Sequence, residues 1–226
     1  YGVADVYVEP FDRAMMTMPW ESFIADLLVG KYHAAHLVAG HDFRFGHKNE
    51  GDVEKLKSYC ASHGLGCDII PRVEKDGVTV SSSYIRALLE AGDAARAAEF
   101  LGHPFSMEGT VRHGDGIGRK RLFPTANLIP EEHLLVPARG VYATRAYLPD
   151  GKRCVGVTNV GVRPTVSEAN RVSVETYLVD YEGDLYGRTL RLDFCMYLRP
   201  ERRFSSTQEL HDMIAQNARE AIEIVK

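Results

Sequence analysis

The sequence predicts two domains of different fold class, an α/β domain followed by an antiparallel β-barrel with a C-terminal helix. Residues 1–102 alternate strand-like and helix-like segments, a rhythm typical of βαβ units with a mostly parallel sheet. After residue 103, turn signals separate runs in which apolar residues recur with period two. With 226 residues, 45% of them hydrophobic, the chain is long enough to bury two cores. We therefore predict domains at 1–102 and 103–226.

The first domain is predicted from short apolar runs and amphipathic stretches. The expected strands are Val3–Val8, a short buried strand at His36–Ala39, and Cys67–Pro71. The expected helices are Trp20–Val29, Val53–His63, a helix ending at Leu89 and capped by Ser82 or Ser83, and Ala94–Leu101.

The second domain is predicted from alternation and turns. Apolar residues alternate in the strand containing Leu190, Leu192, Phe194, Met196 and Leu198, with Arg191, Asp193, Cys195 and Tyr197 on its opposite face. One apolar face per strand favours an antiparallel sheet that closes into a small barrel. A capping box, Ser206-x-x-Glu209, opens a final amphipathic helix that we expect to pack on the barrel. Its expected apolar stripe is Leu210, Met213, Ile214, Ala218, Ala221, Ile222 and Val225.

Composition restricts the function classes. A net charge of -4 disfavours a general nucleic-acid or membrane-surface binder and leaves small anionic ligands possible. The four cysteines have neither C-x-x-C nor zinc spacing, which indicates reduced thiols of a cytoplasmic protein. No apolar run approaches the ~18 residues of a membrane span. The opening YGVADVYVEPF starts within a strand-like pattern without Met, so we expect a fragment.

The stretch around Pro124 carries the first chemical signal. Thr125 and Asn127 offer hard oxygen atoms two residues apart, and Pro124 disfavours a helix, so both side chains are expected on one side of an extended segment. Such oxygens suit Mg²⁺ together with substrate phosphates. Upstream, a glycine-rich loop could place backbone N–H groups against phosphate; its residues are Gly114, Gly116, Gly118 and Arg119. An ordinary polar turn is the alternative interpretation.

Glu175 is the candidate acid–base residue. In the strand around it, Val172, Val174, Thr176 and Leu178 share one face, and Ser173, Glu175 and Tyr177 share the other. A carboxylate there is either solvent-facing or a general base. The second reading requires that Glu175 face the same side as Thr125 and Asn127.

Several motifs of the second half resemble riboflavin kinases in order and interval. They are Gly109-Thr110-Val111, the glycine loop, Phe123-Pro124-Thr125-Ala126-Asn127, Gly140-Val141-Tyr142-Ala143, Asn159–Thr165, Val174-Glu175-Thr176, Asp184-Leu185-Tyr186-Gly187 and Leu198-Arg199-Pro200-Glu201 with Phe204. The resemblance covers residues 103–226. One departure is Arg121-Leu122, which stands where the family usually has Leu-Gly.

The first half resembles the FMN adenylyltransferase module that bacteria fuse ahead of this kinase. Gly40–Gly46 is similar to its G-x-D-F-x-F-G loop and Val80–Arg86 to its I-S-S-T-x-x-R segment. The chain as a whole thus resembles bifunctional enzymes of FAD biosynthesis, with a Rossmann-like nucleotidyltransferase fold expected for the first domain. The family's H-x-G-H phosphate signature is absent from the sequence. We therefore expect the adenylylating half to be incomplete and to make little FAD.

The resemblance implies a role for each candidate residue. Thr125 and Asn127 would hold Mg²⁺ and the ATP phosphates under the glycine loop, and Glu175 would take the proton from the 5′-hydroxyl of riboflavin. Ser82, Ser83 and Arg86 would face nucleotide phosphates, with Asp42 and Phe43 in a loop beside the ligand. The ligands implied are ATP and ADP, riboflavin, FMN and FAD. The alternative is a barrel that binds flavin or nucleic acid without turnover.

Overall fold

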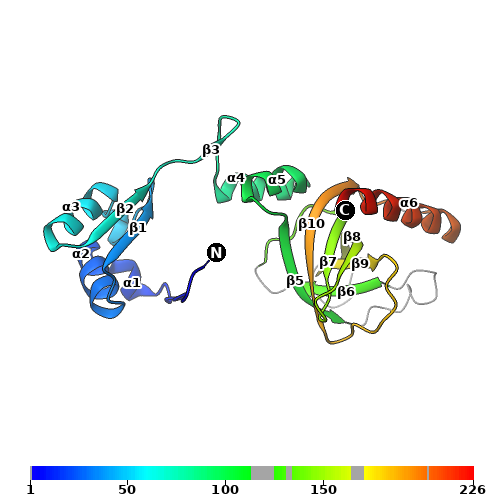
Figure 1. Ribbon diagram of the computed structural model, residues 1–226, viewed down its shortest axis with the longest axis horizontal. Helices are drawn as coiled ribbons and strands as arrows, with labels where there is room; N and C mark the ends of the chain where they lie inside the picture. Colours follow the sequence, from blue (N-terminus) through cyan, green and yellow to red (C-terminus); the bar gives the residue numbers. More distant parts are fainter. Residues whose placement is uncertain (1, 113–124, 131–133, 164–170, 203) are drawn as a thin grey trace. The chain divides into compact units, whose positions relative to one another are not determined.

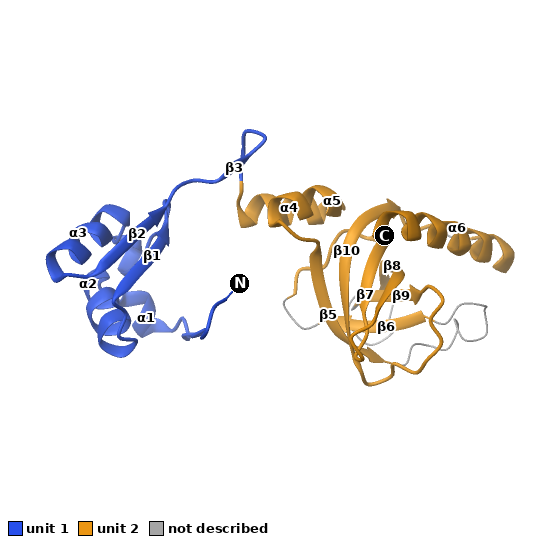
Figure 2. Cartoon of the chain, in the orientation of Figure 1, with its two compact units in different colours: residues 1–79 blue, residues 80–226 orange. Residues whose placement is uncertain are grey.

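The computed structural model describes residues 2–112, 125–130, 134–163, 171–202 and 204–226 (Figure 1). The chain divides into two compact units, Tyr1–Thr79 and Val80–Lys226, which Figure 2 shows in different colours. Within the described ranges, every helix is too short or too polar to cross a bilayer.

The first unit is built around a βαβ arrangement, as predicted. Strands β1 (His36–Gly40) and β2 (Gly66–Ile70) pair in parallel, and α3 (Val53–His63) connects them with the predicted bounds. Asp52 caps α3 by accepting a hydrogen bond from the Lys55 N–H. The remaining elements of this unit are α1 (Arg13–Thr17), α2 (Trp20–Ser22), the π-helix η1 (Phe23–Lys31), the 3₁₀-helix η2 (His47–Asn49), β3 (Glu74–Lys75) and β4 (Val78–Thr79).

Two predictions for this unit are wrong. Val3–Val8 is not a strand, and its apolar side chains are exposed, Val8 by 88%. Alternation alone does not make a strand, because a strand also needs a hydrogen-bonded neighbour, and this segment pairs with none of the described residues. Strand β1 is only half buried, since Leu37 packs into the core whereas Val38 on the opposite face is 62% exposed.

The second unit contains a closed barrel, as predicted. Its strands are β5 (Phe105–Arg112), β6 (Thr125–Pro130), β7 (Gly140–Tyr147), β8 (Arg153–Arg163), β9 (Arg171–Leu178) and β10 (Thr189–Arg199). They close in the order β10-β5-β6-β9-β8-β7, and each neighbouring pair is antiparallel (Figure 1). Apolar residues fill the interior, among them Met107, Leu128, Val174, Leu192 and Phe194.

A pair of short helices precedes the barrel and packs on it. They are α4 (Ser82–Glu90) and α5 (Ala94–Leu101). The Ala138 N–H donates to the Leu89 carbonyl at 2.9 Å, and Ala94 belongs to the apolar core of the barrel. The cap of α4 is Ser81 and not Ser82 or Ser83, because the Ser81 hydroxyl accepts from the Tyr84 N–H. The domain boundary near residue 103 stays a prediction that truncated chains can test.

The predicted alternation along β10 holds only up to Phe194. Leu190, Leu192 and Phe194 are buried in the barrel, but the pairing with β7 shifts register after Phe194. After a bulge of this kind, the strand positions that would have pointed inward point outward, and the reverse. As a result Met196 is 40% exposed, and Tyr197 packs against the barrel core.

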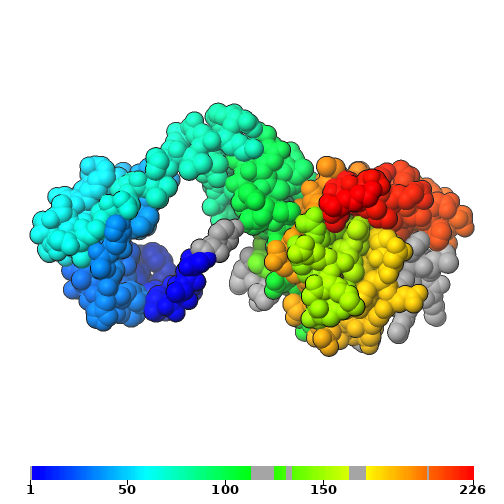
Figure 3. Space-filling view, in the orientation of Figure 1, coloured from blue at the N-terminus to red at the C-terminus, as the bar shows by residue number. Residues whose placement is uncertain are grey.

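The C-terminal helix α6 (Thr207–Val225) packs on the barrel, as predicted, and covers the outside of β7 and β8. Ala218, Ala221 and Val225 pack against Val141, Ala143 and Val157. In Figure 3 the red residues of α6 lie against the yellow-green residues of the barrel. The Ser206 hydroxyl caps the helix through the Glu209 N–H, and the Glu209 carboxylate accepts from the Ser205 N–H at 2.9 Å.

Candidate active site

The outer face of the barrel brings the two predicted metal-binding residues together. Ala126 and Leu128 of β6 point into the core, so their neighbours Thr125 and Asn127 lie on the outer face. Both side chains are half-buried. The Asn127 amide nitrogen is 3.5 Å from the Thr125 carbonyl oxygen, a long contact that holds the nitrogen end of the side chain. The two residues therefore present a hydroxyl and an amide oxygen on one surface.

Glu175 shares this surface with Asn127. The two residues are directly opposite each other in the antiparallel pairing of β6 with β9. Val174 and Thr176, which flank Glu175, are fully buried inside the barrel, so the carboxylate lies on the outer face with Asn127. The requirement that Glu175 face the same side as Thr125 and Asn127 is met.

A third strand adds an amide to the same row. Asn159 of β8 is opposite Glu175 in the pairing of β8 with β9. Its Nδ2 donates to Glu201 Oε1 at 3.1 Å, and the Glu201 carboxylate lies close over Gly161. The Asn159 side chain was not among the residues predicted for the site, although it begins the Asn159–Thr165 motif. Its position in a strand, two residues before Gly161, was visible in the sequence. Its cross-strand neighbour, Glu175, could not be predicted.

Two arginine side chains hold the segment that connects β10 to α6. Arg199 Nε donates to Asn217 Oδ1 of α6 at 2.9 Å, and the guanidiniums of Arg199 and Arg202 lie over the Phe204 ring, 5.6 Å and 4.8 Å from its centroid. Burial and the nearby Arg202 charge lower the pKa of Arg199. Glu201 links this segment to the row that contains Asn159 and Glu175, because its carboxylate accepts the hydrogen bond from Asn159.

Part of the predicted kinase site lies outside the described residues. Gly114, Gly116, Gly118 and Arg119 all fall within 113–124. Their contribution to a phosphate site stays a prediction.

The candidate residues of the first half belong to two different units. Asp42 and Phe43 follow β1 in the first unit, where the Phe43 and Phe45 rings stack with centroids 5.3 Å apart. Ser82, Ser83 and Arg86 occupy the first half of α4, in the second unit, and are exposed.

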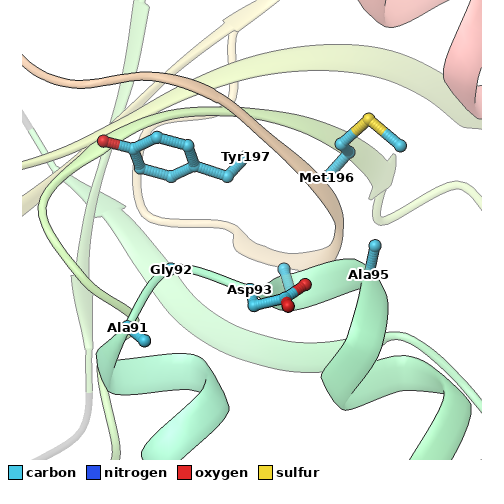
Figure 4. A pocket seen from close by; sticks show the side chains of 7 residues that line it. Ala91, Gly92, Asp93, Ala95, Met196 and Tyr197 are labelled. Carbon is cyan, nitrogen blue, oxygen red and sulfur yellow. The ribbon is translucent and has the colours of Figure 1, made fainter.

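An open hollow of about 290 Å³ lies elsewhere on the second unit. Figure 4 shows its lining residues, which are Met196 and Tyr197 of β10 and residues of the turn between α4 and α5. The hollow contains none of the predicted site residues. The Tyr197 ring passes close to Gly92 and Gly140, where a β-carbon on either glycine would crowd it.

The donor set favours a hard cation held partly by substrate. Among the residues that the structure describes, no three His, Cys, Asp or Glu side chains form a metal-binding group. Thr125 and Asn127 offer neutral oxygens, and Glu175 supplies one carboxylate on the same face. Such a set fits Mg²⁺, which is usually bound by one or two protein groups together with phosphate oxygens.

Comparisons with known proteins give two family matches. Residues 101–225 match the riboflavin kinase family, and residues 1–84 match the FAD synthetase family. The bifunctional riboflavin kinase/FMN adenylyltransferase of Escherichia coli (strain K12) is 38% identical over 216 residues, which cover 96% of this chain and 68% of that protein. The enzyme of the same name from Bacillus subtilis (strain 168) is 33% identical over 98% of this chain and 70% of its own length.

A solved structure has a similar fold. A crystal structure described as a macrolide-efflux protein from Streptococcus pneumoniae is 28% identical, with a TM-score of 0.81 over 91% of this chain and 66% of that one. The description applies to that protein, and the likeness concerns the fold.

Proposed function

Because this chain belongs to the family of bifunctional riboflavin kinases/FMN adenylyltransferases, we propose that its barrel phosphorylates riboflavin on the outer face that holds Thr125, Asn127 and Glu175. The observation that supports this placement most directly is the register of β6 and β9, which puts Asn127 opposite Glu175.

In this proposal Glu175 is the general base. Its carboxylate accepts the proton of the riboflavin 5′-hydroxyl while the hydroxyl oxygen attacks the γ-phosphorus of ATP. The bond from the γ-phosphorus to the β,γ-bridging oxygen breaks, and ADP leaves with that oxygen. FMN and a protonated Glu175 remain, and the proton then passes to water. The protein's main contribution is to hold the nucleophile and the phosphate in line.

Thr125 and Asn127 would bind Mg²⁺ and orient the phosphates. The cation, when bound, neutralises phosphate charge that develops during transfer. The amide nitrogen of Asn127 contacts the Thr125 carbonyl, which turns the amide oxygen away from that strand backbone. The glycine loop with Gly114, Gly116, Gly118 and Arg119 would complete the phosphate site.

The adenylyltransferase activity is assigned to the first half of the chain. Ser82, Ser83 and Arg86 lie within the first five residues of α4, where backbone N–H groups and a guanidinium suit phosphate oxygens. Asp42 and Phe43 would contact the nucleotide or flavin from the loop after β1. We place both activities in the cytoplasm, where ATP and reduced thiols are available.

The test is FMN formation from riboflavin, ATP and Mg²⁺, comparing the wild type with Glu175→Gln. The amide keeps the shape of the side chain but cannot accept the proton in the same way, so we expect kcat to fall by about 10²–10⁴. Riboflavin and ATP should still bind. The matched control is Glu108→Gln, an exposed glutamate in the middle of β5 that is paired with Arg191 of β10.

Two outcomes would contradict the proposal. An unchanged kcat in Glu175→Gln, with a normal fold, would remove Glu175 from the chemistry. Riboflavin binding by the wild type without FMN formation would instead favour a flavin-binding barrel.

A further inference from the structure

Three buried threonines form a row of hydroxyl groups inside the barrel. Thr144 of β7, Thr158 of β8 and Thr176 of β9 are all 0% exposed. Their Oγ1 atoms lie 2.7 Å apart from Thr144 to Thr158 and 2.9 Å apart from Thr158 to Thr176. We call these residues the threonine row. Their neighbours on the same strand faces are apolar, including Tyr142, Val160 and Val174.

The threonine row lies directly behind the proposed kinase site. Thr176 follows Glu175 in β9 and is opposite both Thr158 and Ala126. Ala126 in turn lies between Thr125 and Asn127. Thr176 and Thr158 are therefore adjacent in sequence to Glu175 and Asn159, two residues of the outer row that also contains Asn127, whereas Thr144 has no neighbour in that row.

Gly156 makes room for the row. A β-carbon at Gly156 would lie 2.5 Å from Thr144 Oγ1 and 3.0 Å from Thr176 Cγ2, closer than real side chains approach. The Thr144 and Thr176 side chains thus converge over this glycine from the strands on either side. The space is used by the hydroxyl row and would be lost with any other residue.

The apolar residues of β8 and β9 specify their register only weakly. Val160 is opposite Val174, and Val162 is opposite Val172. If β9 slipped by two residues along β8, a valine could still lie opposite a valine. Among the described residues, the pairing of β9 with β6 spans Thr125–Leu128, so it adds little to the register of β9. A slip of two residues would place Thr176 opposite Val160 or Gly156, and neither residue offers a polar side-chain group.

Such a slip would cost free energy through the hydroxyls. A buried hydroxyl that loses its hydrogen-bond partner destabilises the fold, because it has left water without a replacement partner. A single buried polar pair can therefore select one register among several apolar alternatives, as polar core residues do in coiled coils.

We propose that the threonine row is a register lock that positions Glu175 opposite Asn127 and Asn159, with Thr176 and Thr158 as positioning residues. The functional part of this inference rests on the proposed role of Glu175. The lock itself concerns the pairing of β8 with β9 and can be measured without turnover.

The experiment compares Thr176→Val with Thr144→Val. Both variants replace a fully buried threonine at one end of the row, but they differ in what they release. Thr144→Val keeps the hydrogen bond between Thr158 and Thr176, whereas Thr176→Val leaves β9 without a hydroxyl link to β8. We expect kcat for FMN formation to fall by about 10- to 100-fold in Thr176→Val, with smaller changes in KM. Thr144→Val should stay near the wild-type rate, and Thr176→Ser should restore it.

The register is read directly by NMR. In the wild type we expect cross-strand NOEs between Asn159 and Glu175. In Thr176→Val these NOEs should weaken and a second set of β9 resonances should appear, while Thr144→Val keeps one set. If Thr176→Val does not fold, a triple variant in which Thr144, Thr158 and Thr176 are all replaced by Val replaces it in the test. The triple variant leaves no hydroxyl of the row without a partner, so it should fold and show the same two sets of β9 resonances.

The proposal would be overturned by unchanged NOEs and an unchanged kcat in Thr176→Val, or by equal losses in Thr144→Val and Thr176→Val. Failure of the proposed function gives a different result. In that case Glu175→Gln keeps its activity, and the NOEs of Thr176→Val still report whether the lock exists.

Discussion

Asn127 and Glu175 lie directly opposite each other on neighbouring strands of the barrel, and both side chains are on its outer face. One is a neutral oxygen donor and the other an anion. They are therefore suited to different tasks on one surface, the first as a metal ligand and the second as a proton acceptor. Substitutions at the two positions should have separable effects.

We predict that Thr125→Ala and Asn127→Ala raise the Mg²⁺ concentration needed for half-maximal FMN formation by about tenfold or more. Each variant removes one oxygen donor and leaves the proton acceptor in place. The measurement is a Mg²⁺ titration of the initial rate at saturating riboflavin. Glu175→Gln serves as the comparison, since its kcat should fall with little change in the Mg²⁺ midpoint. Equal Mg²⁺ midpoints in the wild type and both alanine variants would exclude these residues as ligands.

The sequence was sufficient to predict the strand faces of Thr125, Asn127 and Glu175, but not that the three share one surface. Alternation along β9 predicted that Glu175 is on the other face of the strand from Val174 and Thr176, which are buried. The interval of two residues between Thr125 and Asn127 predicted that their side chains share one face of β6. The register between β6 and β9 could not be predicted. It joins residues that are far apart in the chain, and the valines of β8 and β9 are compatible with more than one pairing.

The failures share a physical cause. The strand predicted at Val3–Val8 had the right alternation but has no hydrogen-bonded neighbour among the described residues. Along β10, the bulge after Phe194 exposes Met196 and turns Tyr197 toward the core. Both outcomes depend on long-range pairing, which a periodicity of two does not contain.

We predict that Tyr142 makes the barrel less stable at alkaline pH. Burial, together with the nearby Tyr197, raises the pKa of the Tyr142 phenol well above its usual value of 10.0, and its hydroxyl donates to the Ala138 carbonyl at 2.6 Å. Above pH 10 the unfolded chain loses this proton while the folded chain keeps it. The stabilisation is therefore complete below pH 10 and is lost progressively as the pH rises through the folded pKa.

Urea unfolding from pH 8 to pH 11 measures this effect. Tyr142→Phe should be less stable at pH 8 by about 1 kcal/mol, because it loses one hydrogen bond. Its free energy of unfolding should then fall less steeply with pH than that of the wild type. Parallel pH dependences would mean that Tyr142 is not the group that titrates.

We predict that a chain of residues 103–226 is less stable than one of residues 80–226 but keeps comparable kinase activity. The shorter chain lacks α4 and α5, so it loses Ala94 from the barrel core and the hydrogen bond between Ala138 and Leu89. We expect its melting temperature to be lower by about 5 °C or more, since 1 kcal/mol corresponds to about 2–8 °C in domains of this size.

Activity should survive because α4 and α5 do not pack on β9, the strand that carries Glu175. Helix α5 packs on β10 and β5, whereas Glu175 is on β9, which two strands separate from β10 in either direction around the barrel. Measuring melting temperature and kcat for both chains distinguishes the possibilities. Equal melting temperatures would show that α4 and α5 contribute nothing to the barrel and would favour a boundary at residue 103. A folded 103–226 chain without FMN formation would instead show that the kinase site depends on residues before 103.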